Sequence, residues 1–174
     1  MDVKTVPQGA TLNLFLRGGV AAASAMWYNE YHTLLNAGIN EDELKSFFFD
    51  QHGLNFPEDG IYCLEETFKR DPDLCCRFVR ASLDGWRYAF AKQEETLDVV
   101  MRYIREANVG TNRVHQQWML ERMNDLILPV GNKTVMGHLK QEDYLRVAGE
   151  LKRNGIIKMI PPYGEFYATC TVPR

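Results

Sequence analysis

The feature that most constrains the fold is a series of three amphipathic helices that begins at Asp71-Pro72. Asp caps the free backbone amides of a helix start, and Pro fits the first turn because it has no N–H to lose there. Helical spacing of apolar residues then recurs over residues 93–106 and 112–126. The apolar positions of the first helix are Leu74, Phe78, Leu83, Trp86 and Phe90. We expect these faces to form the core of this part of the chain.

The first forty residues follow a different pattern, in which short apolar segments alternate with helical ones. Residues 3–6 and 20–26 are predicted strands, and residues 10–17 and 30–36 are predicted helices, the second stopped by Gly38. Such alternation is typical of β-α-β units with parallel strands. Further short strands are predicted at residues 47–49, 61–63 and 156–160, and a last helix at residues 142–154. The sequence therefore predicts an α/β fold.

A candidate binding segment, Trp27-Tyr28-Asn29-Glu30, follows the predicted strand at residues 20–26. Ligands of open α/β sheets bind outside the carboxyl ends of the strands, where the chain turns into the next helix. Two aromatic faces, an amide and a carboxylate at that edge suit a polar ring. The alternative is an ordinary strand-to-helix junction with Trp27 and Tyr28 in the core, and the local sequence leaves both interpretations open.

Composition excludes several classes of protein. The chain has 174 residues, of which 45% are hydrophobic, so it can bury a core and fit one domain or two small ones. A net charge of −3 without a basic stripe argues against a nucleic-acid partner. No apolar run is long enough to span a membrane, and the first residues lack the pattern of a signal peptide.

The cysteines and histidines show no metal-binding pattern. Cys63, Cys75, Cys76 and Cys170 contain no CxxC pair, and the four histidines show neither HxH nor HExxH spacing. A bridge between the neighbours Cys75 and Cys76 would be strained, so we interpret them as a buried thiol pair. His115 is interpreted as a packing residue on a helix. We predict no metal site.

Catalytic signatures are also missing from the sequence. It contains no GxSxG nucleophile elbow, no GxxxxGK[ST] phosphate loop and no GxGxxG turn. The acidic pairs Glu65-Glu66 and Glu94-Glu95 lie at predicted helix starts, where a solvated carboxylate is favoured by the helix dipole. We therefore predict a protein that is not an enzyme and carries no cofactor.

Taken in order, the pieces of the chain up to about Leu128 resemble one family, the NMT1/THI5-like solute-binding proteins of ABC import systems. The residues that carry the resemblance are Leu16-Arg17-Gly18-Gly19-Val20-Ala21-Ala22, Trp27-Tyr28-Asn29-Glu30 with Gly38, Gly53 with Pro57-Glu58-Asp59-Gly60-Ile61, Asp71-Pro72, Phe78-Val79-Arg80-Ala81 and Gly85-Trp86-Arg87-Tyr88-Ala89. Each piece alone is weak, but their order and spacing are fairly specific. The chain resembles the carboxyl-terminal half of such a receptor.

The resemblance implies a type II periplasmic-binding-protein fold, in which two α/β lobes grip a solute in the cleft between them. It divides the chain into a second-lobe β-α-β-α segment at residues 1–56, a hinge crossing at residues 57–62 and a helix-rich return to the first lobe at residues 63–174. Closure about the hinge would be the functional motion.

The resemblance also implies a ligand and its contacts. Trp27 or Tyr28 would stack on a small polar heteroaromatic ring such as a thiamine pyrimidine precursor, and Glu30 would pair with its amino group. Asn29 and Tyr62 complete the predicted ligand-binding set. The implied protein partner is an ABC permease, and the implied location is periplasmic or otherwise extracytoplasmic.

Two departures from the family pattern leave alternatives. Ala21 stands where an acidic residue is usual, and the opening strands of the first lobe are absent, so we expect about half a receptor. An exposed half-sheet would favour a homodimer. The same fold also serves a pyrimidine synthase that consumes its own histidine with pyridoxal phosphate and iron, although Cys75-Cys76 matches its cysteine-rich motif poorly. A third interpretation is the ligand-sensing domain of a signalling protein.

Overall fold

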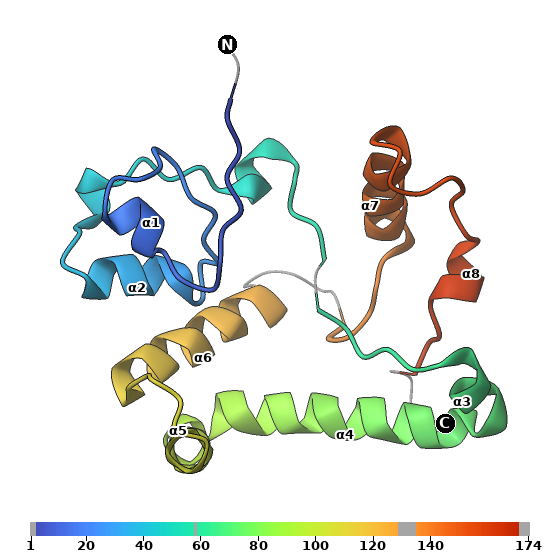
Figure 1. Cartoon of the computed structure of the whole chain (residues 1–174). Helices are drawn as coiled ribbons and strands as arrows, with labels where there is room; N and C mark the ends of the chain where they lie inside the picture. The colour runs from blue at the N-terminus through green and yellow to red at the C-terminus, as the bar shows by residue number, and fades with distance from the viewer. Residues whose placement is uncertain (1–2, 58, 129–134, 171–174) are drawn as a thin grey trace. The chain divides into compact units, whose positions relative to one another are not determined.

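The computed structural model describes residues 3–57, 59–128 and 135–170, and it divides the chain into two compact units (Figure 1). Residues 1–46 and 88–130 belong to the first unit, and residues 47–87 and 131–174 belong to the second. The helices are α1 (Asn13–Leu16), α2 (Glu30–Asn36), α3 (Glu65–Arg70), α4 (Pro72–Ala91), α5 (Gln93–Glu106), α6 (Arg113–Ile127), α7 (Gln141–Arg153) and α8 (Tyr163–Phe166), with single 3₁₀ turns at η1 (Glu41–Glu43) and η2 (Phe49–His52). No helix among these is long and apolar enough to cross a bilayer.

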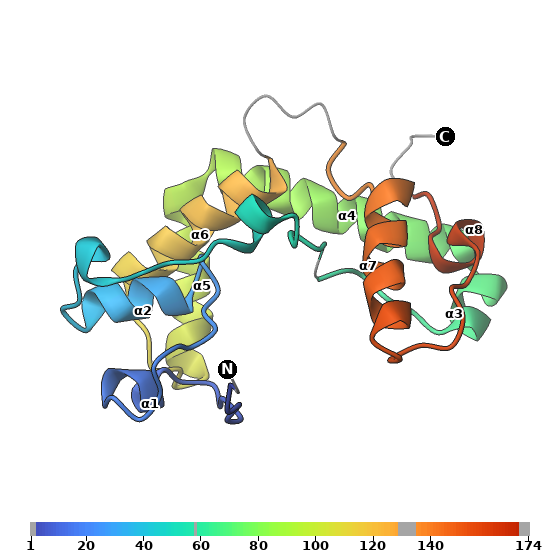
Figure 2. The ribbon, with the colours of Figure 1, turned by 90° about the horizontal axis from the view of Figure 1, so that it is seen from above.

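Helix α6 is the centre of the first unit. It packs against both α5 and α2, and the two views of the ribbon show α2 lying next to it (Figures 1 and 2). Among the residues that the structure describes in this unit, the buried apolar ones are leucines from four separate segments, namely Leu12, Leu34, Leu97 and Leu120. Leu97 of α5 is the most enclosed, with 2% of its surface exposed. The core of the unit is therefore small and depends on a few side chains.

Local sequence signals account for the helix boundaries of this unit. Helices α2 and α5 have the predicted bounds, and Gly38 takes a positive φ of 91° just beyond α2, where a residue without Cβ ends a helix at little cost. Asn112 caps α6, because its Oδ1 accepts a hydrogen bond of 2.9 Å from the backbone N–H of His115. The predicted bounds of α2 and α5 and the stop at Gly38 are confirmed.

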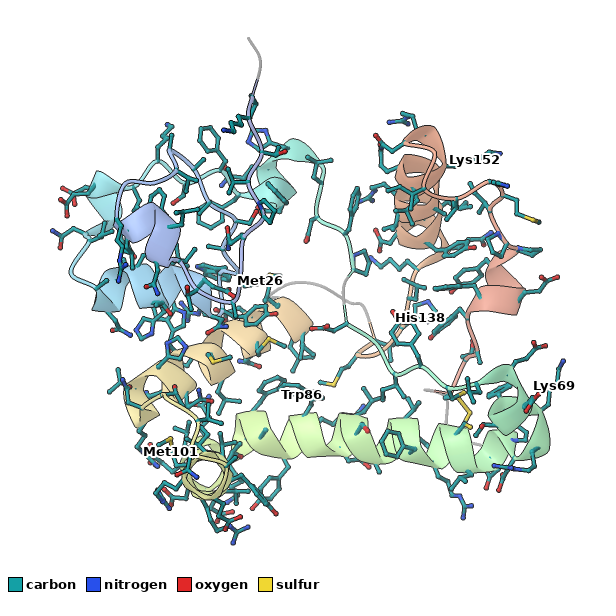
Figure 3. All side chains as sticks on the ribbon, viewed as in Figure 1. Met26, Lys69, Trp86, Met101, His138 and Lys152 are labelled. Atoms are coloured by element: carbon teal, nitrogen blue, oxygen red, sulfur yellow. A yellow bond between two sulfur atoms is a disulfide. The ribbon has the colours of Figure 1, made fainter. Side chains whose placement is uncertain are left out.

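The second unit is organised around Tyr144 on α7. This side chain is buried, and its hydroxyl donates a 2.6 Å hydrogen bond to the carbonyl oxygen of Pro161. Its ring packs against Phe166 of α8 at 4.9 Å between centroids, and Figure 2 shows α7 and α8 side by side. A disulfide joins Cys76 on α4 to Cys170, and it is the yellow bond near Lys69 in Figure 3.

Helix α4 begins as predicted but is less buried than predicted. Asp71 Oδ1 accepts a 2.8 Å hydrogen bond from the backbone N–H of Leu74, with Pro72 in the first turn. Leu83 is buried, whereas 49% of Leu74 and 62% of Phe78 remain exposed. The apolar face is thus only partly covered, and the prediction that all of it forms core is wrong.

The predicted α/β fold with a second-lobe β-α-β segment is also wrong, because the described ranges contain no strand. A strand exists only through hydrogen bonds to a neighbouring strand, and residues 3–6 and 20–26 have no such neighbour here. Instead, the side-chain amide of Gln8 bonds the backbone of Ser24 on both sides, donating to its carbonyl oxygen at 2.8 Å and accepting from its N–H at 3.0 Å. One side chain thereby takes the place of a ladder partner.

The prediction of a buried thiol pair at Cys75-Cys76 is wrong as well. Cys76 is bonded to Cys170 across 94 residues, and Cys75 is a half-buried free thiol. The spacing of cysteines in a sequence does not show which of them pair, so the sequence could not predict a bond between Cys76 and Cys170.

Candidate functional site

The predicted binding segment Trp27–Glu30 forms the turn that enters α2, and its four residues are half-buried. Glu30 is the first residue of the helix, and its Oε2 accepts a 2.9 Å hydrogen bond from the backbone N–H of Met26. The N–H of Asn29 donates to the carbonyl oxygen of Met26 at 3.1 Å. The carboxylate therefore holds the turn together through one of its two oxygens.

A chain of hydrogen bonds links this turn to α6. Asn29 Oδ1 lies 2.9 Å from Nε2 of His115, and Nδ1 of His115 lies 2.9 Å from Nδ1 of His32. The side-chain nitrogen of Asn36 lies 3.2 Å from the same Nδ1 of His32. Residues more than eighty positions apart in the sequence are thus joined by side-chain contacts.

The facing Nδ1 atoms of His32 and His115 can share only one proton between them. The tautomers of the two rings decide which nitrogen donates, and the side-chain amide of Asn36, which can only donate through its nitrogen, favours Nδ1 of His32 as an acceptor. Burial lowers the pKa of His32, and the nearby His115 lowers it further. Protonation of His32 is therefore disfavoured in the folded chain.

Trp118 and Arg122 of α6 cover the same turn. The Trp118 ring stacks on His32 with centroids 4.6 Å apart and planes at 8°, and its Nε1–H donates to the carbonyl oxygen of Trp27 at 3.2 Å. The guanidinium carbon of Arg122 lies 5.1 Å from the Trp27 ring centroid and 4.9 Å from that of Trp118, within cation–π range. Figure 3 shows labelled Met26, which precedes the turn, beside α6. We name the residues of this region the imidazole–indole cluster: Trp27, Asn29, His32, His115, Trp118 and Arg122.

Sequence reasoning identified the turn but missed most of its partners. His32, Trp118 and Arg122 were not predicted as site residues, and His115 was interpreted only as a satisfied packing residue. A signal was present, because 29, 32 and 36 share one face of a helix and 115, 118 and 122 share one face of another. Polar and aromatic residues at such spacing indicate that two helices face each other through them.

Tyr62, the fifth predicted ligand contact, belongs to the second unit and is 77% exposed. Trp27, Tyr28, Asn29 and Glu30 lie together in the first unit because they are consecutive in the sequence. The structure does not bring Tyr62 to them within one unit. Within the described ranges no group of three or more His, Cys, Asp or Glu side chains is placed to hold a metal ion.

Residues 1–96 match the protein family described as NMT1/THI5 like. The chain belongs to this family. The match includes the turn at Trp27–Glu30 but ends before α6. The resemblance read from the sequence is thus confirmed to residue 96, whereas it was drawn to about Leu128.

One curated relative of this NMT1/THI5-like chain is the riboflavin-binding protein RibY of Chloroflexus aurantiacus. The two are 31% identical over 103 residues, which is 56% of this chain and 29% of RibY. The chain therefore spans less than a third of the relative's length. No solved structure matches the chain.

Proposed function

We propose that this NMT1/THI5-like chain is part of a solute-binding protein that takes up a small, planar nitrogen heteroaromatic. Family membership supports a binding role, and the printed name of the relative, a riboflavin-binding protein, supports a heteroaromatic ligand. The observation that carries the proposal is the turn Trp27–Glu30, which presents ring faces, an amide and a carboxylate inside the matched residues. The proposal includes no catalytic step.

The ligand class follows from the chemistry of the turn. The indole of Trp27 and the phenol of Tyr28 provide apolar faces for stacking, and Asn29 and Glu30 provide polar atoms for the edge of the ring. A thiamine pyrimidine precursor and a flavin both present a nitrogen ring with donors and acceptors along one edge. An aminopyrimidine becomes a cation on protonation, whereas the flavin ring is neutral, and Glu30 suits the cation better.

Glu30 can serve both the fold and a ligand. An ionised carboxylate has two oxygens with about four acceptor positions, so the bond to Met26 leaves acceptor capacity for a ligand. We infer that Glu30 pairs with an amino group of the ring, that Trp27 or Tyr28 stacks on it, and that Asn29 adds a polar contact. In this scheme residues 57–62 act as a hinge, and Asp59 already adopts a positive φ of 59° there.

The proposed setting is an ABC import system. A permease would receive the solute from this protein outside the cytoplasm, as is usual for the family. The disulfide between Cys76 and Cys170 supports an extracytoplasmic location, since disulfides persist in oxidising compartments.

The experiment is a calorimetric titration of the purified chain with an aminopyrimidine and with riboflavin, repeated on Glu30→Gln. Glutamine keeps an oxygen that accepts the Met26 N–H but has no charge, so we expect an unchanged melting temperature and at least tenfold weaker aminopyrimidine binding, about 1.4 kcal/mol. Riboflavin, being neutral, serves as the ligand whose affinity should change little.

The matched control is Asp50→Asn, an exposed carboxylate of the second unit, which should leave both affinities unchanged. Failure of the wild-type chain to bind either ring would refute the proposal. Equal weakening by Glu30→Gln and Asp50→Asn would refute the role of Glu30.

A further inference from the structure

All four cysteines of the chain lie in the second unit. Cys76 and Cys170 form a disulfide, with their Cα atoms 4.8 Å apart. Cys63 and Cys75 are free thiols, and the Sγ of Cys75 lies 4.0 Å from the Sγ of Cys63 as a weak hydrogen-bond donor. Because Cys75 and Cys76 are neighbours in the first turns of α4, the two sulfur pairs meet at the same end of one helix.

We propose that Cys63 and Cys75 form a second disulfide, which completes a framework of two bonds, Cys63–Cys75 and Cys76–Cys170. The two sulfurs are already in contact, and bonding requires them to close from 4.0 Å to about 2.05 Å. Cys63 is exposed and lies outside a helix, two residues before α3, so its side chain can turn toward Cys75 without breaking helical hydrogen bonds. The proposal rests on this sulfur geometry and does not depend on the proposed ligand.

Other pairings of the free thiols are less favourable. A bond between Cys75 and its neighbour Cys76 would strain the chain, and Cys76 is already bonded to Cys170. A bond between Cys63 and Cys170 would require breaking that disulfide. The arrangement therefore leaves Cys63 and Cys75 as each other's partner.

Formation of the bond needs an oxidant, and a disulfide compound of the glutathione type supplies it. The exposed thiolate of Cys63 attacks one sulfur of that compound, forms a mixed disulfide and releases one small thiolate. The thiolate of Cys75 then attacks the Cys63 sulfur and displaces the second small thiolate. The protein loses two thiol protons and two electrons, and the oxidant is reduced to two thiols. Burial raises the pKa of Cys75, and its hydrogen bond to Cys63 raises it further, which is why we assign the first attack to Cys63.

The bond would enclose α3 in a covalent loop between residues 63 and 75. It would also fix the chain at the residue after Tyr62, which is the end of the predicted hinge at residues 57–62. A protein with two such bonds and no unpaired cysteine is typical of an oxidising compartment.

The test uses the purified full chain, incubated with glutathione disulfide and then labelled with N-ethylmaleimide in denaturant. Intact mass before oxidation should show two labels, on Cys63 and Cys75, and after oxidation it should show neither labels nor attached glutathione. Peptide mapping should then recover Cys63 linked to the fragment that holds Cys75 and Cys76. Two glutathiones or two labels on the oxidised wild type would overturn the proposal.

Variants assign the partners. Cys63→Ser should leave Cys75 without a partner and carrying one glutathione, with Cys76–Cys170 intact. The control Cys76→Ser with Cys170→Ser, incubated with glutathione disulfide in the same way, should still close Cys63 to Cys75 and retain no attached glutathione. A link from Cys63 to Cys76 in the wild type would contradict the proposal. If a variant fails to fold, the wild-type result alone tests the proposal.

Discussion

Acidification below about pH 6.5 should destabilise the first unit, because folding lowers the pKa of His32. His32 is buried, and its pKa is lowered by burial first and by the neighbouring His115 second. In the unfolded chain the same side chain has its ordinary pKa, so the unfolded state binds the proton more readily. The stabilisation is therefore complete above the unfolded pKa and is lost as the pH falls toward and through the folded pKa.

The size of the destabilisation is set by the single proton that His32 binds in the unfolded state. A difference of one bound proton between the two states changes the free energy of unfolding by at most about 1.4 kcal/mol per pH unit. Between about pH 6.5 and pH 5, where most carboxylates remain ionised, the loss is at most about 2 kcal/mol. The contacts explain why the folded state resists the proton. The Nδ1 of His32 lies 2.9 Å from the Nδ1 of His115, and its ring is covered by Trp118.

The assay is urea unfolding over this pH range, followed by tryptophan fluorescence, to which Trp118 contributes from its position against His32. His32→Gln removes the titrating group and should flatten the pH dependence between about pH 5 and pH 6.5. The matched control is His52→Gln, an exposed histidine of the second unit, which should retain the wild-type slope. If His32→Gln keeps the same slope as the wild type, the reasoning is refuted.

Two further substitutions test individual bonds by urea unfolding. Trp118→Phe keeps a ring against His32 but removes the N–H that bonds the Trp27 carbonyl oxygen, and the expected loss is about 1 kcal/mol. An unchanged midpoint would show that this carbonyl gains an equivalent partner. Asp71→Ala removes the cap of α4 and should also cost about 1 kcal/mol, whereas Asp71→Asn, which retains a capping oxygen, should cost much less. Equal losses in the two Asp71 variants would contradict a capping role.

The sequence predicted the helices well because their signals are local. The cap at Asp71 and the apolar spacing of residues 93–106 depend on residues within one or two turns, so helices α4 and α5 begin where predicted. Strands depend on partners far away in the chain, and apolar composition alone predicted one at residues 20–26. In the structure the Ser24 backbone is bonded by the Gln8 side chain instead.

The same distinction applies to the candidate site. The sequence singled out the turn from Trp27 to Glu30, because its residue types stand next to one another. It could not show that His115 and Trp118 would contact this turn, since those contacts depend on how α2 and α6 pack. Whether the turn binds a ligand remains a prediction, which the Glu30→Gln titration tests.

The family match and the contact geometry support different halves of the imidazole–indole cluster. Residues 1–96 include Trp27, Asn29 and His32, so the resemblance bears on the turn. Helix α6 lies beyond the match, and its contribution rests on contacts alone. The Arg122 guanidinium lies over the indole rings of Trp27 and Trp118 and makes a cation–π contact with each. A ligand that stacks on Trp27 would compete with Arg122 for that ring. If Trp27 is the stacking residue, Arg122→Gln should therefore strengthen binding of a neutral ring such as riboflavin; if Tyr28 is, the affinity should not change.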